Sequence, residues 1–255
     1  MTSRRPLIGL VAALYVAPLA VLPVRALADA WRAPALLPQQ WGTRGLRYLA
    51  AGGDVLTAVS NSLLVAVATT AVALVLGWPV ARRLAAVGER QRFVLLVLLA
   101  TPLLVPQYAV GVGLTAWLLR LGLADRLSGL VLAHLVYVLP YVIVLLAPGF
   151  TARVGALEEQ AATLGAGRVQ RLRRVTLPAI APALAAATLL GLLVSWSQYG
   201  TSLAVAGNVP MLPVRLLPFV GSDPQLAAAL ALVFLAPALL ALVATARFAH
   251  RGQAH

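Results

Sequence analysis

The sequence predicts an all-α, polytopic membrane protein with about six transmembrane helices. Three observations support this: 61% of the 255 residues are hydrophobic, only 11% are charged, and the mean hydropathy is +0.92. A soluble protein of this size uses more polar surface. Because one spanning helix needs about 20 apolar residues, the chain has room for about six, and we expect residues 1–255 to form a single transmembrane domain.

Six apolar stretches stand out, at roughly residues 7–28, 55–79, 93–117, 130–150, 179–206 and 225–247. An even number of spans places both termini on one side. All twenty basic residues are arginine; with the N-terminus inside, thirteen lie in cytoplasmic segments and seven outside. The positive-inside rule therefore predicts cytoplasmic termini, and the net charge of +13 is interpreted as cytoplasmic surface charge rather than as a nucleic-acid site.

The first stretch has a second interpretation. Arg4 and Arg5, the apolar run and "ALA" at 26–28 also fit a cleavable secretory signal. The run is long for a signal core, and five more stretches follow, so a retained span is the expectation. Whether residues 1–28 are retained or cleaved stays open at this stage.

Catalytic and metal-binding patterns are missing from the sequence. There is no cysteine, and of three histidines His134 stands alone within the fourth stretch, so no metal cluster follows from spacing. The seven acids lie in loops or at span ends, where they form no intramembrane proton relay. We therefore expect no catalytic residue, no metal and no cofactor in this chain.

One long segment is polar: "LEEQAATLGAGRVQRLRRVTLP", residues 157–178. Its first part predicts a short amphipathic helix, with the acids in the first turn and Leu157, Ala161 and Leu164 on one face. Gly165 and Gly167 permit a sharp turn. The chain then resumes a helix until Pro178 opens the fifth span. Such short helices are marginal alone, so contact with the spans or with a partner is expected.

This segment resembles the Glu-Ala-Ala loop of the permease subunits of binding-protein-dependent ABC importers of type I. The match rests on Glu159, Ala161, Gly165 and the Leu177–Pro178 pair, while Gln160 replaces the family's first alanine. "SNSLLVAVATTAVALVLGWPVA" and "TPLLVPQYAVGVG" look similar to the family's second and third spans, so the resemblance covers most of residues 55–205.

The resemblance implies that residues 151–178 form a cytoplasmic coupling loop that docks on a separate ATPase. The implied coupling residues are Glu158, Glu159, Ala161, Leu164, Gly165, Leu177 and Pro178. It further implies a multi-pass protein of the bacterial inner membrane that pairs with a second permease copy or a homologous permease. Two ATPase subunits, which bind the ATP, and an extracytoplasmic solute-binding protein would complete the system.

Polar residues within the spans are candidates for the translocation path. Ser195, Gln198, Tyr199 and Ser202 recur at i, i+3, i+4 and i+7 of the fifth stretch, which predicts one shared helical face. Packing between spans explains such small polar residues equally well. Weaker candidates are Asn61, Gln107 and His134, the last in a stripe with Tyr137 and Tyr141 that fits either a pore or a buried seam.

Three other classes stay in view at this stage. A self-contained secondary transporter would need intramembrane acids or unwound half-helices, a membrane enzyme would need a catalytic cluster, and a non-transporting scaffold would need neither. The substrate also stays open among iron, thiamine, polyamines, phosphonates and others.

Overall fold

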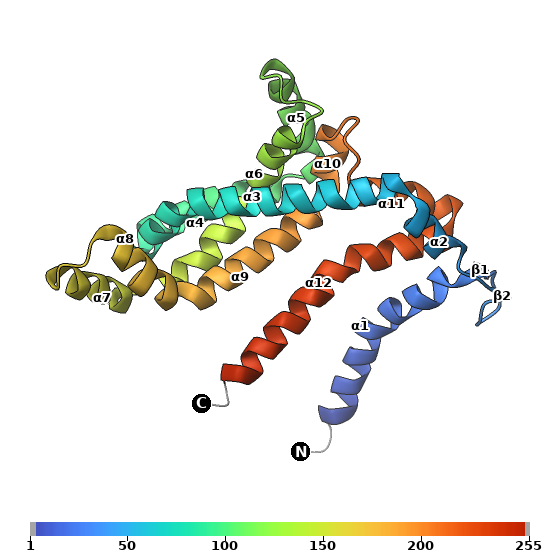
Figure 1. Cartoon of the computed structure of the whole chain (residues 1–255), viewed down its shortest axis with the longest axis horizontal. Helices are drawn as coiled ribbons and strands as arrows, with labels where there is room; N and C mark the ends of the chain where they lie inside the picture. The colour runs from blue at the N-terminus through green and yellow to red at the C-terminus, as the bar shows by residue number, and fades with distance from the viewer. Residues whose placement is uncertain (1–3, 253–255) are drawn as a thin grey trace. The chain divides into compact units, whose positions relative to one another are not determined.

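The computed structural model describes the backbone of residues 4–252 and, within it, the side chains other than those of residues 4–6, 8, 12 and 241–252 (Figure 1). Arg4, Arg5, Arg247 and Arg251, which entered the count of cytoplasmic charges, have side chains outside the described set. The chain divides into two compact units, one from residues 1–59 with 210–255 and one from residues 60–209.

The first unit combines the two ends of the chain. Its elements are α1 (Arg4–Ala26), β1 (Ala28–Ala30), β2 (Gln40–Trp41), α2 (Arg44–Ala51), the start of α3 (Gly53–Ala86), α11 (Leu212–Ser222) and α12 (Pro224–Gly252). Helix α12 packs against α1, α2 and α11, and Figure 1 shows α1 and α12 side by side. Ala26, Ala228 and Ala229 are buried where these helices meet, which lets their backbones approach closely.

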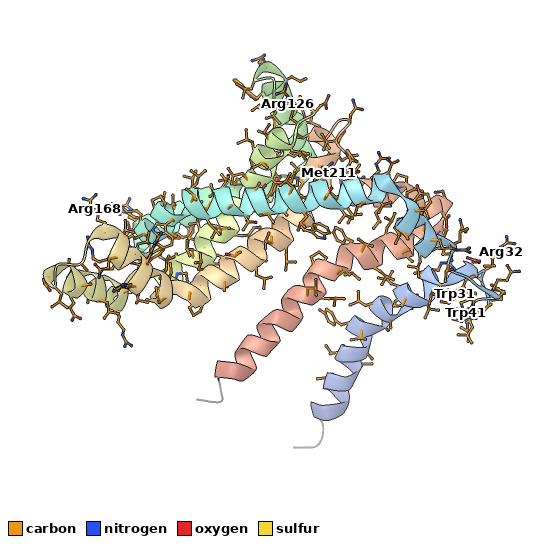
Figure 2. All side chains as sticks on the ribbon, viewed as in Figure 1. Trp31, Arg32, Trp41, Arg126, Arg168 and Met211 are labelled. Carbon is orange, nitrogen blue, oxygen red and sulfur yellow. The ribbon has the colours of Figure 1, made fainter. Side chains whose placement is uncertain are left out.

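A short antiparallel hairpin, β1 with β2, follows α1. Trp31 lies beside it, and its indole Nε1 donates to the carbonyl of Ala35 at 2.9 Å. Arg25 donates to the carbonyl of Trp31 at 2.8 Å and its guanidinium lies 5.5 Å from the centroid of that ring. Trp31 and Trp41 both lie in the hairpin region (Figure 2), and indole rings favour the headgroup level of a bilayer.

A polar network connects this hairpin to the start of α12. Arg44 binds Asp223 through both guanidinium nitrogens, with N···O distances of 2.6 and 3.0 Å. Asp223 Oδ1 also accepts from the backbone N–H of Leu226 at 3.2 Å, so it caps α12. Gln225 Nε2 donates to Asp29 Oδ1 at 2.7 Å. The guanidinium of Arg44 lowers the pKa of Asp223 below its usual value.

The second unit contains the rest of α3 and the helices that follow it. They are α4 (Glu89–Ala100), η1 (Thr101–Leu104), α5 (Gln107–Arg120), α6 (Leu127–Leu146), η2 (Ala147–Gly149), α7 (Ala152–Thr163), α8 (Arg168–Arg171), η3 (Leu172–Thr176), α9 (Leu177–Trp196) and α10 (Gly200–Val205). Helix α6 packs along α9, and α10 packs on α5 and α6. The core of this unit lies among α3, α6 and α9.

Glycines bring these helices into close contact. A Cβ on Gly191 of α9 would lie 3.0 Å from Thr70 Cγ2 of α3 and 3.2 Å from Val142 Cγ2 of α6. A Cβ on Gly111 of α5 would lie 2.6 Å from that of Ala204 on α10. Small residues at helix crossings serve the same purpose throughout membrane proteins, because packing drives association between apolar helices in lipid.

The structure confirms the all-α, polytopic class but not the count of six spans. Four segments among the described residues are long and apolar enough to cross a bilayer: Gly9–Ala26, Gly53–Ala86, Leu127–Gly149 and Arg168–Trp196. Glu89–Leu104 and Gln107–Arg120 make a fifth if the pair, bent by 91°, counts as one span. The described apolar part of α12, Pro224–Leu240, is shorter, so a sixth span stays a prediction.

Two predicted spans differ in detail. The third is interrupted at residues 101–106, because Pro102 and Pro106 lack the N–H that an unbroken helix needs. The fifth was predicted to run to residue 206 but ends at Trp196, and α10 begins only at Gly200. Both breaks lie within predicted spans, where the freed backbone groups need partners.

We predict that Asp223 stabilises the first unit mainly as a helix cap. Asp223→Ala should lower the free energy of unfolding by about 1–2 kcal/mol, since it removes both the cap and the ion pair with Arg44. Asp223→Asn keeps a capping side chain and should lose less than about 1 kcal/mol. Thermal unfolding in detergent measures both variants; equal losses would show that the ion pair, not the cap, matters.

Candidate coupling site and intramembrane polar cluster

The predicted coupling loop, residues 151–178, begins with a capped helix. Thr151 Oγ1 accepts the N–H of Val154 at 3.3 Å, and α7 runs from Ala152 to Thr163. The helix ends at Leu164, where Gly165 adopts a φ of +83°. The N–H of Gly165 bonds the carbonyl of Ala162 at 3.0 Å and the N–H of Ala166 bonds that of Ala161 at 2.9 Å. This is the Schellman pattern of helix ends, in which glycine takes the left-handed residue.

Two expectations about α7 were wrong. The helix starts at Ala152 rather than near Leu157, so Glu158 and Glu159 lie beyond its first turn and gain no stabilisation from its N-terminal dipole. The inward face carries Val154 and Glu158, both buried, instead of Leu157, Ala161 and Leu164. The sequence pattern favoured the wrong face because a carboxylate took a position where an apolar residue was expected.

Glu158 connects α7 to two other segments. Its carboxylate accepts hydrogen bonds from the guanidinium of Arg82 on α3 and from Thr176 Oγ1 of η3, the latter at 2.5 Å. Burial alone would raise the pKa of Glu158, but the hydrogen bonds from Thr176 and Arg82, together with the charges of Arg82 and Arg171, lower it below its ordinary value. Glu158 is therefore ionised, and its carboxylate links α7 to α3 and η3.

The outward side of the loop is partly apolar. Leu164 is 87% exposed and Val169 64%. Glu159 is also exposed, and a Cβ on Gly165 would meet no atom within 4 Å. Ala161 and Leu177 are half-buried, and Pro178 is exposed at the second position of α9, directly after the π-helical segment. A surface of this kind is suited to a protein partner.

A second group of predicted residues meets inside the second unit. His134 on α6 is fully buried; its Nδ1 lies 2.9 Å from Ser195 Oγ and its Nε2 lies 3.0 Å from Ser202 Oγ. Ser202 Oγ donates to the carbonyl of Gln198 at 2.5 Å. Because that hydroxyl proton is used, Nε2 is the donor to Ser202 Oγ. The ring thus links the end of α9 to α10 through two serine hydroxyls.

Gln198 occupies the break itself. Its Oε1 accepts from Thr201 Oγ1 at 3.0 Å, while its buried Nε2 has no hydrogen-bond partner among the described residues. The chain leaves the helix between Trp196 and Gly200, so the predicted continuous helical face of Ser195, Gln198, Tyr199 and Ser202 is wrong. Ser195, Gln198 and Ser202 still converge, but through a bend and through His134.

The remaining candidates are placed less closely. Tyr199 is half-buried, Asn61 lies half-buried on α3, and Gln107 is exposed at the first position of α5. Tyr137, in the same stripe as His134, donates from its hydroxyl to the carbonyl of Val105 at 3.0 Å, next to the break before α5. In this chain the two stripe residues form a hydrogen-bonded seam. That any of these residues lines the path stays a prediction.

Sequence reasoning missed two residues that matter to the loop. Arg82 lies 76 positions before Glu158 and Thr176 lies 18 after it. Neither carries a local signal, because an arginine at the end of a span is expected from the charge distribution alone. The described residues hold no group of three or more acidic or histidine side chains that could bind a metal.

Comparison with known proteins identifies the family of this chain. Residues 55–251 match the model of the family described as binding-protein-dependent transport system inner membrane component, and the chain belongs to this family. It is therefore the permease subunit of an ABC import system, a transport subunit that crosses the inner membrane several times.

Individual relatives agree with this assignment. A putative ABC transporter permease from Streptomyces antibioticus is 35% identical over 65% of this chain and 73% of its own length. A probable molybdenum ABC transporter permease from Haloferax volcanii is 32% identical over 74% of each chain. A solved bacterial ABC transporter that imports the acidic polysaccharide alginate shares the fold, with a TM-score of 0.75 at 18% identity over 96% of this chain and 94% of that chain.

We predict that Glu158 contributes to stability whereas its neighbour Glu159 does not. Glu158→Gln should lower the free energy of unfolding at pH 7 by about 1–3 kcal/mol, because Arg82 then lacks its charged partner. The exposed Glu159→Gln should change it by less than about 0.5 kcal/mol. Thermal unfolding of the two purified variants compares them directly.

The contribution of Glu158 to the free energy of unfolding should depend on pH. Since the folded-state pKa of Glu158 lies below the ordinary value of 4.5, the stabilisation is complete above that value and is lost as the pH falls through the lowered pKa. The difference between wild type and Glu158→Gln should therefore shrink under acid. A difference that grew on acidification would contradict the ion pair.

Proposed function

We propose that residues 157–178 couple this permease to a cytoplasmic ATPase subunit. The observation that carries the proposal is that the two neighbouring acids of α7 have different surroundings. Glu158 is buried and binds Arg82 and Thr176. Glu159, Leu164 and the turn that follows are exposed. Leu164 and Val169 are both exposed near the glycine turn, and apolar groups gathered on a surface mark contact sites for other proteins.

The hydrogen bonds of Glu158 would transmit a movement of the loop to the spans. A partner that displaces α7 also displaces Glu158, and through it Arg82 on α3 and Thr176 at the start of α9. Both helices contribute to the core of the second unit. Because such a packed core resists continuous deformation, a shift of the loop would move both helices together.

The assembly follows from the family and from this surface. We infer two ATPase subunits that bind the ATP, a second copy of this chain or a homologous permease, and an extracytoplasmic solute-binding protein. With the loop on the ATPase side, both termini are cytoplasmic, in agreement with the distribution of arginine. This chain itself would then hold no cofactor and catalyse no reaction, and the translocation path would pass near Ser195, Gln198 and Tyr199.

We further propose that the cargo is a tetrahedral oxyanion. The support comes from relatives: besides the molybdenum permease above, the similar chains include molybdate/tungstate permeases and a sulfate permease that is 37% identical over 41% of this chain. This narrows the substrate range that the residues alone left open. Iron, thiamine and polyamines become the alternatives to test.

Leu164→Asp should release the ATPase. The side chain is 87% exposed, so folding should be unaffected while co-purification of the ATPase falls about tenfold or more, equivalent to about 1.4 kcal/mol of lost binding. Leu36→Asp is a matched control, since Leu36 is 91% exposed in the hairpin region outside the loop. Equal recovery of the ATPase with wild type, Leu164→Asp and Leu36→Asp would disprove the coupling surface.

The cargo proposal predicts which loaded binding protein stimulates the complex. In proteoliposomes that contain the whole importer, the binding protein loaded with molybdate or sulfate should raise ATP hydrolysis several-fold. Ferric iron, thiamine and spermidine should leave it at the unloaded level. Stimulation by one of these three and by no oxyanion would contradict the proposed substrate class while leaving the coupling surface untouched.

A further inference from the structure

A pocket lies beneath the coupling loop, on its inner side. It has a volume of about 210 Å³ and is lined by Trp78 and Arg82 of α3, Glu158 of α7, Arg168 and Arg171 of α8, and Leu172 and Thr176 of η3. All these residues belong to the second unit. The pocket therefore sits where the end of one span and the start of another meet the loop.

The lining carries excess positive charge. Three arginines surround one carboxylate, and that carboxylate is already bound by Arg82 and Thr176. Arg168 and Arg171 take part in no ion pair with a described residue. An electropositive recess with a single engaged acid attracts anions from its surroundings.

Arg171 has an unmet hydrogen-bond donor. Its Nε is buried and has no partner among the described residues. Leaving a buried donor unpaired costs about 1–3 kcal/mol, and more for a charged group. The same side chain lines the pocket, so a small movement of the guanidinium would bring this donor to a bound oxygen.

The backbone at the pocket is also irregular. Residues Leu172–Thr176 form a π-helical segment between α8 and α9, and both of its end residues line the pocket. Widened turns of this kind occur mostly as single turns within α-helices and are frequent at functional sites. Here the segment places Thr176 against Glu158, and Arg171, which directly precedes it, lines the recess.

We propose that this pocket binds a phosphate-type oxyanion through Arg168 and Arg171. Guanidinium groups bind phosphate oxygens with two parallel hydrogen bonds. The phosphate could come from the headgroup of an anionic phospholipid or from free inorganic phosphate. Trp78 favours the lipid, because indole rings concentrate at the headgroup level. The proposal depends neither on the cargo nor on the ATPase contact.

The test uses the assembled importer, delipidated in mild detergent, with Arg171→Gln, Arg168→Gln and the control Arg173→Gln. Arg173 is exposed in the same helical segment but does not line this pocket, so the control removes the same charge. Native mass spectrometry counts retained phosphatidylglycerol against phosphatidylcholine. Thermal shift then measures stabilisation by phosphatidylglycerol and by inorganic phosphate.

We expect wild type and Arg173→Gln to retain phosphatidylglycerol, and both pocket variants to retain at least about fivefold less, a loss of about 1 kcal/mol in binding. Stabilisation by inorganic phosphate that both pocket variants lose would instead assign the site to the free anion. If Arg173→Gln lost as much binding as the pocket variants, or if no protein distinguished the anionic probes from phosphatidylcholine, the site would be refuted. Arg168, which is exposed, keeps the test valid should Arg171→Gln fail to fold.

Discussion

Backbone amide and carbonyl groups cannot be left unpaired in the hydrocarbon layer, and this requirement governs the second unit. Two predicted spans break, one at residues 101–106 and the other between Trp196 and Gly200. Helix α6 contributes a side chain at each break: Tyr137 binds the carbonyl of Val105, and His134 bridges Ser195 and Ser202. At the first break α6 thus pairs a backbone carbonyl directly, and at the second it links the two helix ends through their serine hydroxyls.

The same helix supplies the close packing on which the loop depends. Glycine at the crossing of α9 with α3 and α6 keeps these helices near one another. This proximity brings Arg82, near the end of α3, and Thr176, just before α9, within reach of Glu158. A hydrogen bond at 2.5 Å to an ionised carboxylate is short and strong, so α7 is attached firmly to the spans that it would move.

The proposed function depends on which side chains of the loop stay exposed once α7 is bound to the spans. Glu158 is buried and bound to other residues of this unit, whereas Glu159 and Leu164 are exposed on the surface. Adjacent acids on one helix therefore have opposite surroundings, about 100° apart around its axis. Beneath them the pocket with Arg168 and Arg171 keeps an unpaired donor. In both proposals together, the loop presents one face to a protein partner and another to an anion.

The sequence by itself determined the all-α membrane class, the approximate positions of the apolar helices and the turn at Gly165, because hydrophobicity and a left-handed glycine are local properties. It misplaced the buried face of α7 and extended the fifth helix across Ser197–Tyr199, since a helical pattern cannot tell an inward carboxylate from a solvated one. Only the tertiary structure decided that Glu158 meets Arg82, 76 residues away, and that His134 closes the break in the fifth span. Such pairs depend on which helices pack together, and that choice is made by the whole set of crossings rather than by any one segment.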